Sequence, residues 1–192
     1  QMGHQQPSVV HEMMIDSPEY KAVGMNVPGV PGIAIGHTPH LAWALTSGVA
    51  DTNDMYFNAL GENNTYLYGG KALPLEMVPF TVKVKGGEDM RVVQMRTRFG
   101  PVILNSKSQK VVVSQKSSQW GLELKSFEAM LSIVRATSFS DVEAGMRNGQ
   151  SSFNAFVAMK NGTIGYRYVG NVPMRPEGAD PRFPLPGEPE FE

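Results

Sequence analysis

The chain has 192 residues, a hydrophobic fraction of 41% and a charged fraction of 18%, which are typical of a globular protein with one domain or one domain and a small appendage. Its formal net charge is −1 and its 17 Lys and Arg residues are spread along the sequence, so neither nucleic acid nor an anionic membrane surface is an expected partner. The absence of cysteine excludes disulfides, zinc–thiolate sites and a cysteine nucleophile.

The first part of the chain is predicted to form short strands separated by turns. Its 20 Gly and 14 Pro residues favour turns, of which the Pro28-Gly-Val-Pro-Gly32 segment is typical. Phe80, Val82 and Val84 alternate with polar residues before a break at Gly86-Gly87, which predicts a two-stranded unit with one buried face. The predicted strands cover 9–15, 20–27, 33–36, 41–46, 53–59, 65–68, 77–84, 90–95 and 111–115.

Two helices are predicted to interrupt this series of strands. Apolar residues at three-to-four spacing predict an amphipathic helix over 126–137. The segment Ser138-Phe-Ser-Asp-Val-Glu143 offers a serine or an aspartate as the cap of a second helix, which ends near Asn148-Gly149. Together with the strands, these helices near 126–148 predict an α+β fold that is mostly β.

After the helices the sequence returns to strands and then to an extended tail. Strands are predicted at 153–159 and 163–168, joined by an Asn-Gly pair that is a strong hairpin signal. The tail, 173–192, is rich in proline, which excludes regular helix and central strand, so it is predicted to wrap a surface or to hang loose.

Two segments carry residue types in a specific order. The first, 31–56, contains a Gly-His turn, a strand with Trp43, a Thr-Ser-Gly turn and an acidic stretch that ends in Tyr56. The second begins at Asn154, continues through the Asn-Gly turn to an Ile-Gly-Tyr strand, and ends in Gly170-x-Val-Pro-Met-Arg175. Both segments resemble the penicillin acylase family, whose members are N-terminal-nucleophile amide hydrolases.

The resemblance covers nearly the whole chain and implies that 1–192 is a single fragment of the large (β) chain of such an enzyme. The fold implied is part of an α/β/β/α sandwich with an additional β region. The family's catalytic serine is the first residue of the large chain and corresponds to a position upstream of Gln1. The fragment alone is therefore expected to be inactive.

Amide hydrolysis needs hydrogen-bond donors for the oxyanion of the tetrahedral intermediate. The resemblance assigns this role to the backbone N–H of Ser47 and to the side-chain amide of Asn154. It also makes Gln1 a residue that helps to orient the nucleophile and the asparagine, and it places Arg175 near the substrate pocket. The tyrosines at 56, 66, 68, 166 and 168 alternate along strands and are expected to pack as core or pocket aromatics.

Asp51, Asn53 and Asp54 offer two carboxylates and a backbone carbonyl in a short loop, which suits a hard cation such as calcium. Some penicillin acylases bind calcium at this place, so the resemblance implies a structural calcium ion in the intact enzyme. The alternative is an acidic turn capped by its own side chains. Zinc is not expected at His37 and His40, because Pro39 between them excludes the helix that would place both on one face.

The resemblance further implies a small-molecule acyl-amide substrate, such as a penicillin or an acyl-homoserine lactone. The implied partners are the missing N-terminal segment and the small (α) chain of the same precursor, in the periplasm or outside the cell. An unpaired sheet edge would favour self-association of the fragment. A different reading of the same residues is a β-rich ligand-binding or protein-interaction module, in which Asn154, Arg175 and the tyrosines bind rather than catalyse.

Overall fold

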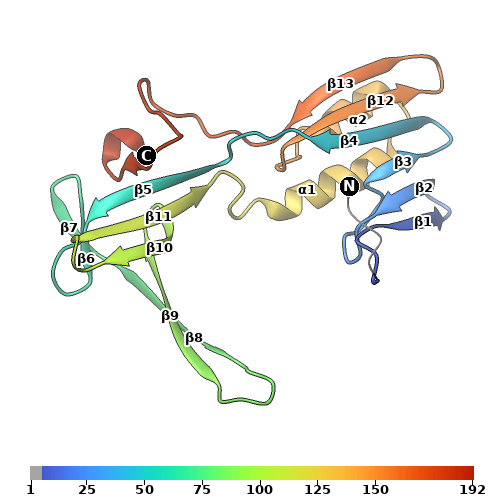
Figure 1. The fold of residues 1–192 in the computed structure, drawn as a ribbon. Coiled ribbons are helices and arrows are strands. Elements are labelled where there is room, and N and C mark those ends of the chain that lie inside the picture. Colours follow the sequence, from blue (N-terminus) through green and yellow to red (C-terminus); the bar gives the residue numbers. More distant parts are fainter. Residues whose placement is uncertain (1–5) are drawn as a thin grey trace. The chain divides into compact units, whose positions relative to one another are not determined.

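The computed structural model describes residues 6–192 and divides the chain into two compact units (Figure 1). Unit 1 contains the residues up to Ala50 together with Gln119–Val172, and unit 2 contains Asp51–Ser118 and Pro173–Glu192. Each unit has its own sheet and its own apolar core.

Unit 1 is built on a six-stranded sheet in which neighbouring strands are antiparallel. The late strand β12 pairs with β4, so segments more than 100 residues apart in the sequence lie side by side (Figure 1). In sheet order the strands are β1 (His11–Asp16), β2 (Lys21–Asn26), β3 (Ile35–His37), β4 (Leu41–Ser47), β12 (Phe153–Met159) and β13 (Ile164–Val169).

Two helices, α1 (Glu123–Arg135) and α2 (Phe139–Met146), pack on one face of this sheet. Helix α2 begins with a capping box between Ser138 and Asp141, where the sequence predicts a cap. The core between helices and sheet contains Trp43, Ile133, Val134, Val142, Met146, Ala155 and Val157. Both predicted helices are therefore confirmed, although α1 begins at Glu123 rather than near residue 126.

Unit 2 contains a second six-stranded sheet and a two-stranded hairpin. Tyr56 stacks on Phe99 with ring centroids 4.2 Å apart, and Val112 is fully buried. Val112 pairs with Asn58, two residues from Tyr56, so Tyr56 and Val112 lie on the same, buried face of β5 and β11. The sheet contains β14 (Leu185–Pro186), β5 (Asn53–Ala59), β11 (Val111–Ser117), β10 (Gly100–Ser106), β9 (Met90–Thr97) and β8 (Glu76–Val82), and the hairpin contains β6 (Thr65–Tyr68) and β7 (Lys71–Pro74).

The proline-rich tail lies against unit 2. Its short strand β14 adds to the edge of the sheet in parallel with β5, a position that proline tolerates. The buried Asn58 side chain donates to the Gly187 carbonyl oxygen at 2.5 Å. The final carboxylate side chain, Glu192, accepts from the Tyr68 hydroxyl and from Arg98, and a short 3-10 turn, Pro189–Phe191, precedes it.

The predicted fold class is confirmed, because the chain is mostly β with two helices. The sequence did not reveal β7 or β10. Strand β10 begins with Gly100-Pro101 and contains a register shift between Val102 and Leu104, so its apolar residues do not alternate as those of a regular strand do.

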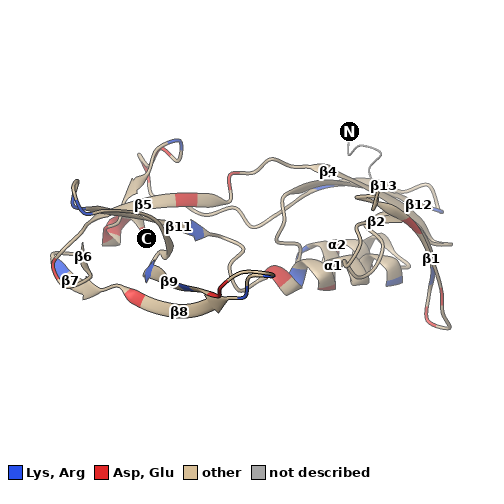
Figure 2. Cartoon of the chain, turned by 60° about the horizontal axis from the view of Figure 1, so that its bottom comes forward, with Lys and Arg blue, Asp and Glu red and all other residues tan. Residues whose placement is uncertain are grey.

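Charged residues of both signs are interspersed along the elements of both units (Figure 2). Within residues 6–192, neither helix has the length and the apolar run that a crossing of the bilayer needs.

Candidate active site

Ser47 and Asn154 are neighbours at one end of the unit 1 sheet. Ser47 is the last residue of β4 and Asn154 is the second residue of β12, and the register pairs Asn154 with Thr46. Asn154 Nδ2 donates to the Ser47 carbonyl oxygen at 3.0 Å and to the Thr46 hydroxyl at 3.2 Å. The fold therefore brings together the two residues that the sequence predicted as oxyanion donors, although 107 residues separate them.

The backbone N–H of Ser47 lies at the open edge of β4. The next residue, Gly48, donates its N–H to the Ser152 carbonyl oxygen at 3.0 Å, and successive peptide groups of a strand point to opposite edges. The Ser47 N–H is thus directed away from β12. On that side β3 pairs with β4 at Trp43 and Ala42, so Ser47 lies beyond the reach of β3.

The turn after Ser47 requires glycine because the two strands come very close there. A Cβ atom at Gly48 would lie 2.4 Å from Ser152 Oγ and 3.0 Å from the Phe153 nitrogen. The Ser152 hydroxyl oxygen also accepts from the Ala50 N–H at 2.9 Å. These contacts fix the backbone that follows the Ser47 donor.

Two exposed tyrosines of β13 reach this site, and the sequence predicted them only as core or pocket aromatics, without a link to the two donors. The Tyr166 hydroxyl donates to Asn154 Oδ1 at 2.7 Å, and the Tyr168 hydroxyl donates to the Gly48 carbonyl oxygen at 3.0 Å. Their side chains are 57% and 43% exposed, in contrast to the buried Tyr56 of unit 2. The Asn-Gly hairpin could have found them, because its register places Tyr168 opposite Asn154.

An apolar cavity of about 500 Å³ lies between the unit 1 sheet and its helices. Leu45 and Ile35 line it from the strands, and Phe127 and Met130 line it from α1. Ser47 also borders the cavity. The Asn154 side chain extends from the other face of the sheet and donates a hydrogen bond to the Ser47 carbonyl oxygen. Ser47 is therefore in contact with both the apolar cavity and the side-chain amide of Asn154.

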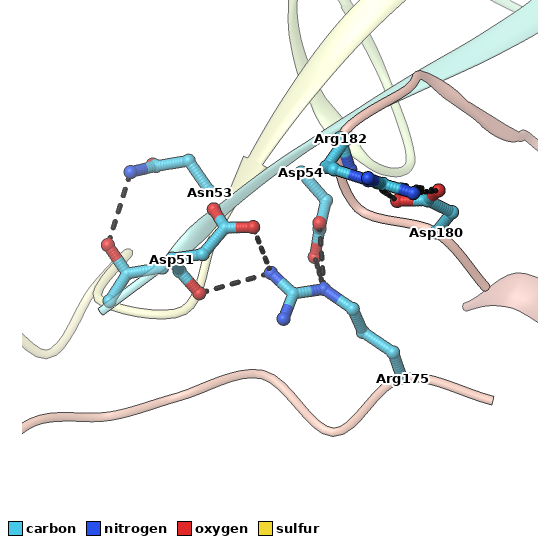
Figure 3. Close-up of polar contacts among 7 residues, drawn as sticks. Asp51, Asn53, Asp54, Arg175, Asp180 and Arg182 are labelled. Carbon is cyan, nitrogen blue, oxygen red and sulfur yellow. Dashed lines mark hydrogen bonds and ion pairs between the residues drawn. The ribbon is translucent and has the colours of Figure 1, made fainter. Parts of the chain in front are cut away.

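In unit 2, Arg175 binds both acidic residues that the sequence singled out as calcium ligands (Figure 3). Its Nε lies 2.9 and 3.1 Å from the two carboxylate oxygens of Asp54, and its Nη2 lies 3.0 Å from the Asp51 carbonyl oxygen and 3.1 Å from its carboxylate. Asn53 turns its side chain to the Thr52 hydroxyl. Burial, followed by the charge of Asp54, raises the pKa of the neighbouring Tyr56 hydroxyl.

The residues as they lie do not form a calcium cage. Within the described part of the chain, no three His, Asp or Glu side chains come together in a way that could hold a metal ion. Calcium needs six to eight oxygen ligands, and the Asp51 and Asp54 oxygens face a guanidinium group instead. Calcium binding therefore stays a prediction for the intact protein.

Of the predicted site residues, Ser47 and Asn154 lie together in unit 1, and Arg175, Asp51 and Asp54 lie together in unit 2. Gln1 lies outside the described residues. The roles of all of these residues stay predictions.

Known proteins with the same features identify the family. A family model described as penicillin amidase matches residues 1–192, the whole chain. The chain belongs to the penicillin amidase family. It superimposes over its full length on a thermostable penicillin G acylase from Alcaligenes faecalis with a TM-score of 0.94 and 26% identity, and the match covers 35% of that chain.

The relatives of this chain carry two kinds of name. The chain is 25% identical over 189 residues to penicillin G acylase of Escherichia coli, a match that covers 97% of this chain and 22% of that protein. It is 28% identical over 195 residues to the acyl-homoserine lactone acylase QuiP of Pseudomonas aeruginosa, with 94% of this chain and 23% of that protein covered. The chain thus spans less than a quarter of the length of these relatives, and it is similar to both of these acylases.

Proposed function

We propose that this chain is the part of an amide hydrolase that stabilises the oxyanion formed when an acyl group is cleaved from an amine. The observation that carries the proposal is the hydrogen bond between Asn154 Nδ2 and the Ser47 carbonyl oxygen, which holds a side-chain donor beside the open edge of β4. Family membership supports amide hydrolysis as the reaction. Preorganised donors of this kind usually supply a large share of such catalysis.

In the proposed reaction a serine hydroxyl oxygen attacks the amide carbonyl carbon, and the α-amine of the same serine takes the hydroxyl proton. The carbonyl oxygen becomes an oxyanion, which accepts from the Ser47 N–H and from Asn154 Nδ2. The Asn154 proton shared with Thr46 Oγ1 makes the longer of its two contacts and is the one that turns to the oxyanion. The amine then leaves with the proton, and water hydrolyses the acyl-enzyme.

The nucleophilic serine of this reaction lies, in our proposal, outside the 192 residues, at the start of the large chain of an N-terminal-nucleophile enzyme. The fragment alone would be inactive, and the small chain and the N-terminal segment of the same precursor would complete the site. The coverage of less than a quarter of the relatives supports this proposal.

We propose that the acyl group occupies the apolar cavity beside Ser47. A volume of about 500 Å³ is within the range of small-molecule sites, and apolar side chains such as Leu45, Ile35 and Met130 line it. The names of the relatives make penicillin-type and acyl-homoserine lactone-type amides the substrates to test first.

The test is hydrolysis of a panel of chromogenic acyl anilides by the parent precursor after processing, by the same protein with its first large-chain serine changed to alanine, and by the fragment alone. We expect activity only in the first. Activity in the fragment would mean that the nucleophile lies within these residues. Inactivity of all three on every acyl group would favour a β-rich ligand-binding module instead.

A further inference from the structure

Tyr166 and Tyr168 stand on the same face of β13, because they are two residues apart on one strand. This face also carries Asn154 and Phe156, whereas Ala155 and Val157 of β12 point into the helix-covered core. The rings of Tyr166 and Phe156 lie 5.2 Å apart. Both tyrosine hydroxyls therefore lie beside the strand that carries the oxyanion asparagine.

The contacts of Asn154 determine which way its amide group faces. The Ser47 carbonyl oxygen can only accept, so the group 3.0 Å from it must be the NH₂ and not the oxygen. The amide oxygen then faces Tyr166, whose hydroxyl proton it accepts at 2.7 Å. A rotated amide would bring two oxygens together at Ser47, so the Ser47 carbonyl oxygen selects this orientation. The Tyr166 hydroxyl adds a hydrogen bond at the opposite end of the amide group and so limits its movement.

Tyr168 acts on the other donor through the backbone. Its single proton goes to the Gly48 carbonyl oxygen at 3.0 Å, so in the 3.1 Å contact with Ser152 the serine hydroxyl is the donor. Ser152 in turn accepts from the Ala50 N–H at 2.9 Å. This chain of hydrogen bonds fixes the turn that begins at Ser47.

We propose that Tyr166 and Tyr168 are positioning residues for the two oxyanion donors: Tyr166 fixes the amide of Asn154, and Tyr168 fixes the peptide backbone after Ser47. The inference rests on the proposed function of Ser47 and Asn154. Neither tyrosine takes or gives a proton in the reaction. Both tyrosines are more than 40% exposed, so they are not part of the apolar core of unit 1.

The experiment uses the processed parent enzyme with Tyr166→Phe, Tyr168→Phe, Asn154→Ala and the two double variants that combine each tyrosine change with Asn154→Ala. Phenylalanine keeps the ring and removes only the hydroxyl. A single oxyanion donor is worth about 10²- to 10³-fold in kcat, and loosening it should cost about tenfold, with KM nearly unchanged. Tyr20→Phe is the matched control, since Tyr20 lies in the turn between β1 and β2, at the opposite edge of the sheet from β13, with Arg135 over its ring.

The double variants separate positioning from other roles. Tyr166 acts through Asn154, so Tyr166→Phe should have no further effect once Asn154 is alanine. Tyr168 acts on the backbone donor, so its effect should multiply with that of Asn154→Ala. A full kcat in Tyr166→Phe, or an effect that persists in its double variant, would overturn the role of Tyr166, and a full kcat in Tyr168→Phe would overturn that of Tyr168.

The kcat of Asn154→Ala and the folding of each single variant separate a failure of the positioning role from a failure of the proposed function. If Asn154→Ala retains full kcat, the proposed function of Asn154 fails and with it the positioning role of Tyr166. Far-ultraviolet circular dichroism and the unfolding temperature should match those of the parent protein in each single variant. A tyrosine variant that loses its fold would overturn the positioning role of that tyrosine, since the hydroxyl would then be needed for folding.

Discussion

Arg175 and Asp54 form an ion pair in unit 2 in which the guanidinium Nε lies 2.9 and 3.1 Å from the two carboxylate oxygens, although 121 residues separate them. The Asp54 side chain is 4% exposed and that of Arg175 is 16% exposed. The pair joins the start of β5 to the first residues of the tail.

Removal of Arg175 should destabilise unit 2 strongly. In Arg175→Gln the buried Asp54 carboxylate loses its charged partner, and breaking a buried pair in this way typically costs about 3–5 kcal/mol. Urea unfolding followed by tyrosine fluorescence measures the loss. The double variant Arg175→Gln/Asp54→Asn should recover much of the lost free energy of unfolding. Equal stability of Arg175→Gln and the parent chain would show that the ion pair contributes little to stability.

The 192-residue chain should not depend on calcium for its stability. Arg175 already pairs with the carboxylates of both Asp51 and Asp54, so excess EDTA or added calcium should leave the unfolding temperature of the chain unchanged. Differential scanning calorimetry checks this, with magnesium as the control cation. A clear rise in the unfolding temperature with calcium alone would show instead that the ion displaces the guanidinium or binds beside it.

Filling the apolar cavity should change which acyl chain length the enzyme prefers, while the two oxyanion donors at Ser47 and Asn154 stay in place. In Leu45→Trp the larger side chain would occupy part of the space beside Ser47. In the processed parent enzyme we expect KM to rise for long acyl chains and to change little for acetyl or propionyl anilides. Leu124→Trp, at an exposed position of α1, is the control. An equal effect on all chain lengths would place the acyl group elsewhere.

The capping box of α2 should make stability depend on pH. Hydrogen bonds from the Thr137 N–H, and next from Ser138, lower the pKa of Asp141 below its ordinary value of 3.8. A lowered pKa means that the cap stabilises the folded state above pH 3.8 and that this contribution is lost as the pH falls through the lower, folded-state value. Asp141→Asn should therefore unfold at a lower temperature than the parent chain at neutral pH, and the gap should close in acid.

The control for this prediction is Glu128→Gln, an exposed acidic residue of α1 outside any cap. Its unfolding temperature should follow that of the parent chain at each pH. A constant gap for Asp141→Asn from neutral to acidic pH would contradict the assigned role of the Asp141 charge.

Sequence patterns predicted the strands with clear alternation and the helices with a regular apolar stripe, because these signals are local. The resemblance to the penicillin acylase family singled out Ser47 and Asn154, which the antiparallel pairing of β4 and β12 brings together. The link from Tyr166 to Asn154 depends on side-chain direction as well as register, and alternation alone does not distinguish it from packing.

The pairing of Arg175 with Asp51 and Asp54 was not predicted for a different reason. Each residue was singled out, but for separate roles, because the sequence gives no distance between the tail and β5. Only the path of the tail along unit 2 shows that an arginine faces the acidic turn.

The most direct test of the account is kcat of the processed parent enzyme with Asn154→Ala, measured on its best acyl anilide. The account predicts a fall of about 10²- to 10³-fold with little change in KM or in unfolding temperature, because the lost donor acts mainly in the transition state. A kcat within a factor of about two of the parent value, well below what one oxyanion donor is worth, would contradict the assignment of Asn154 to the oxyanion hole.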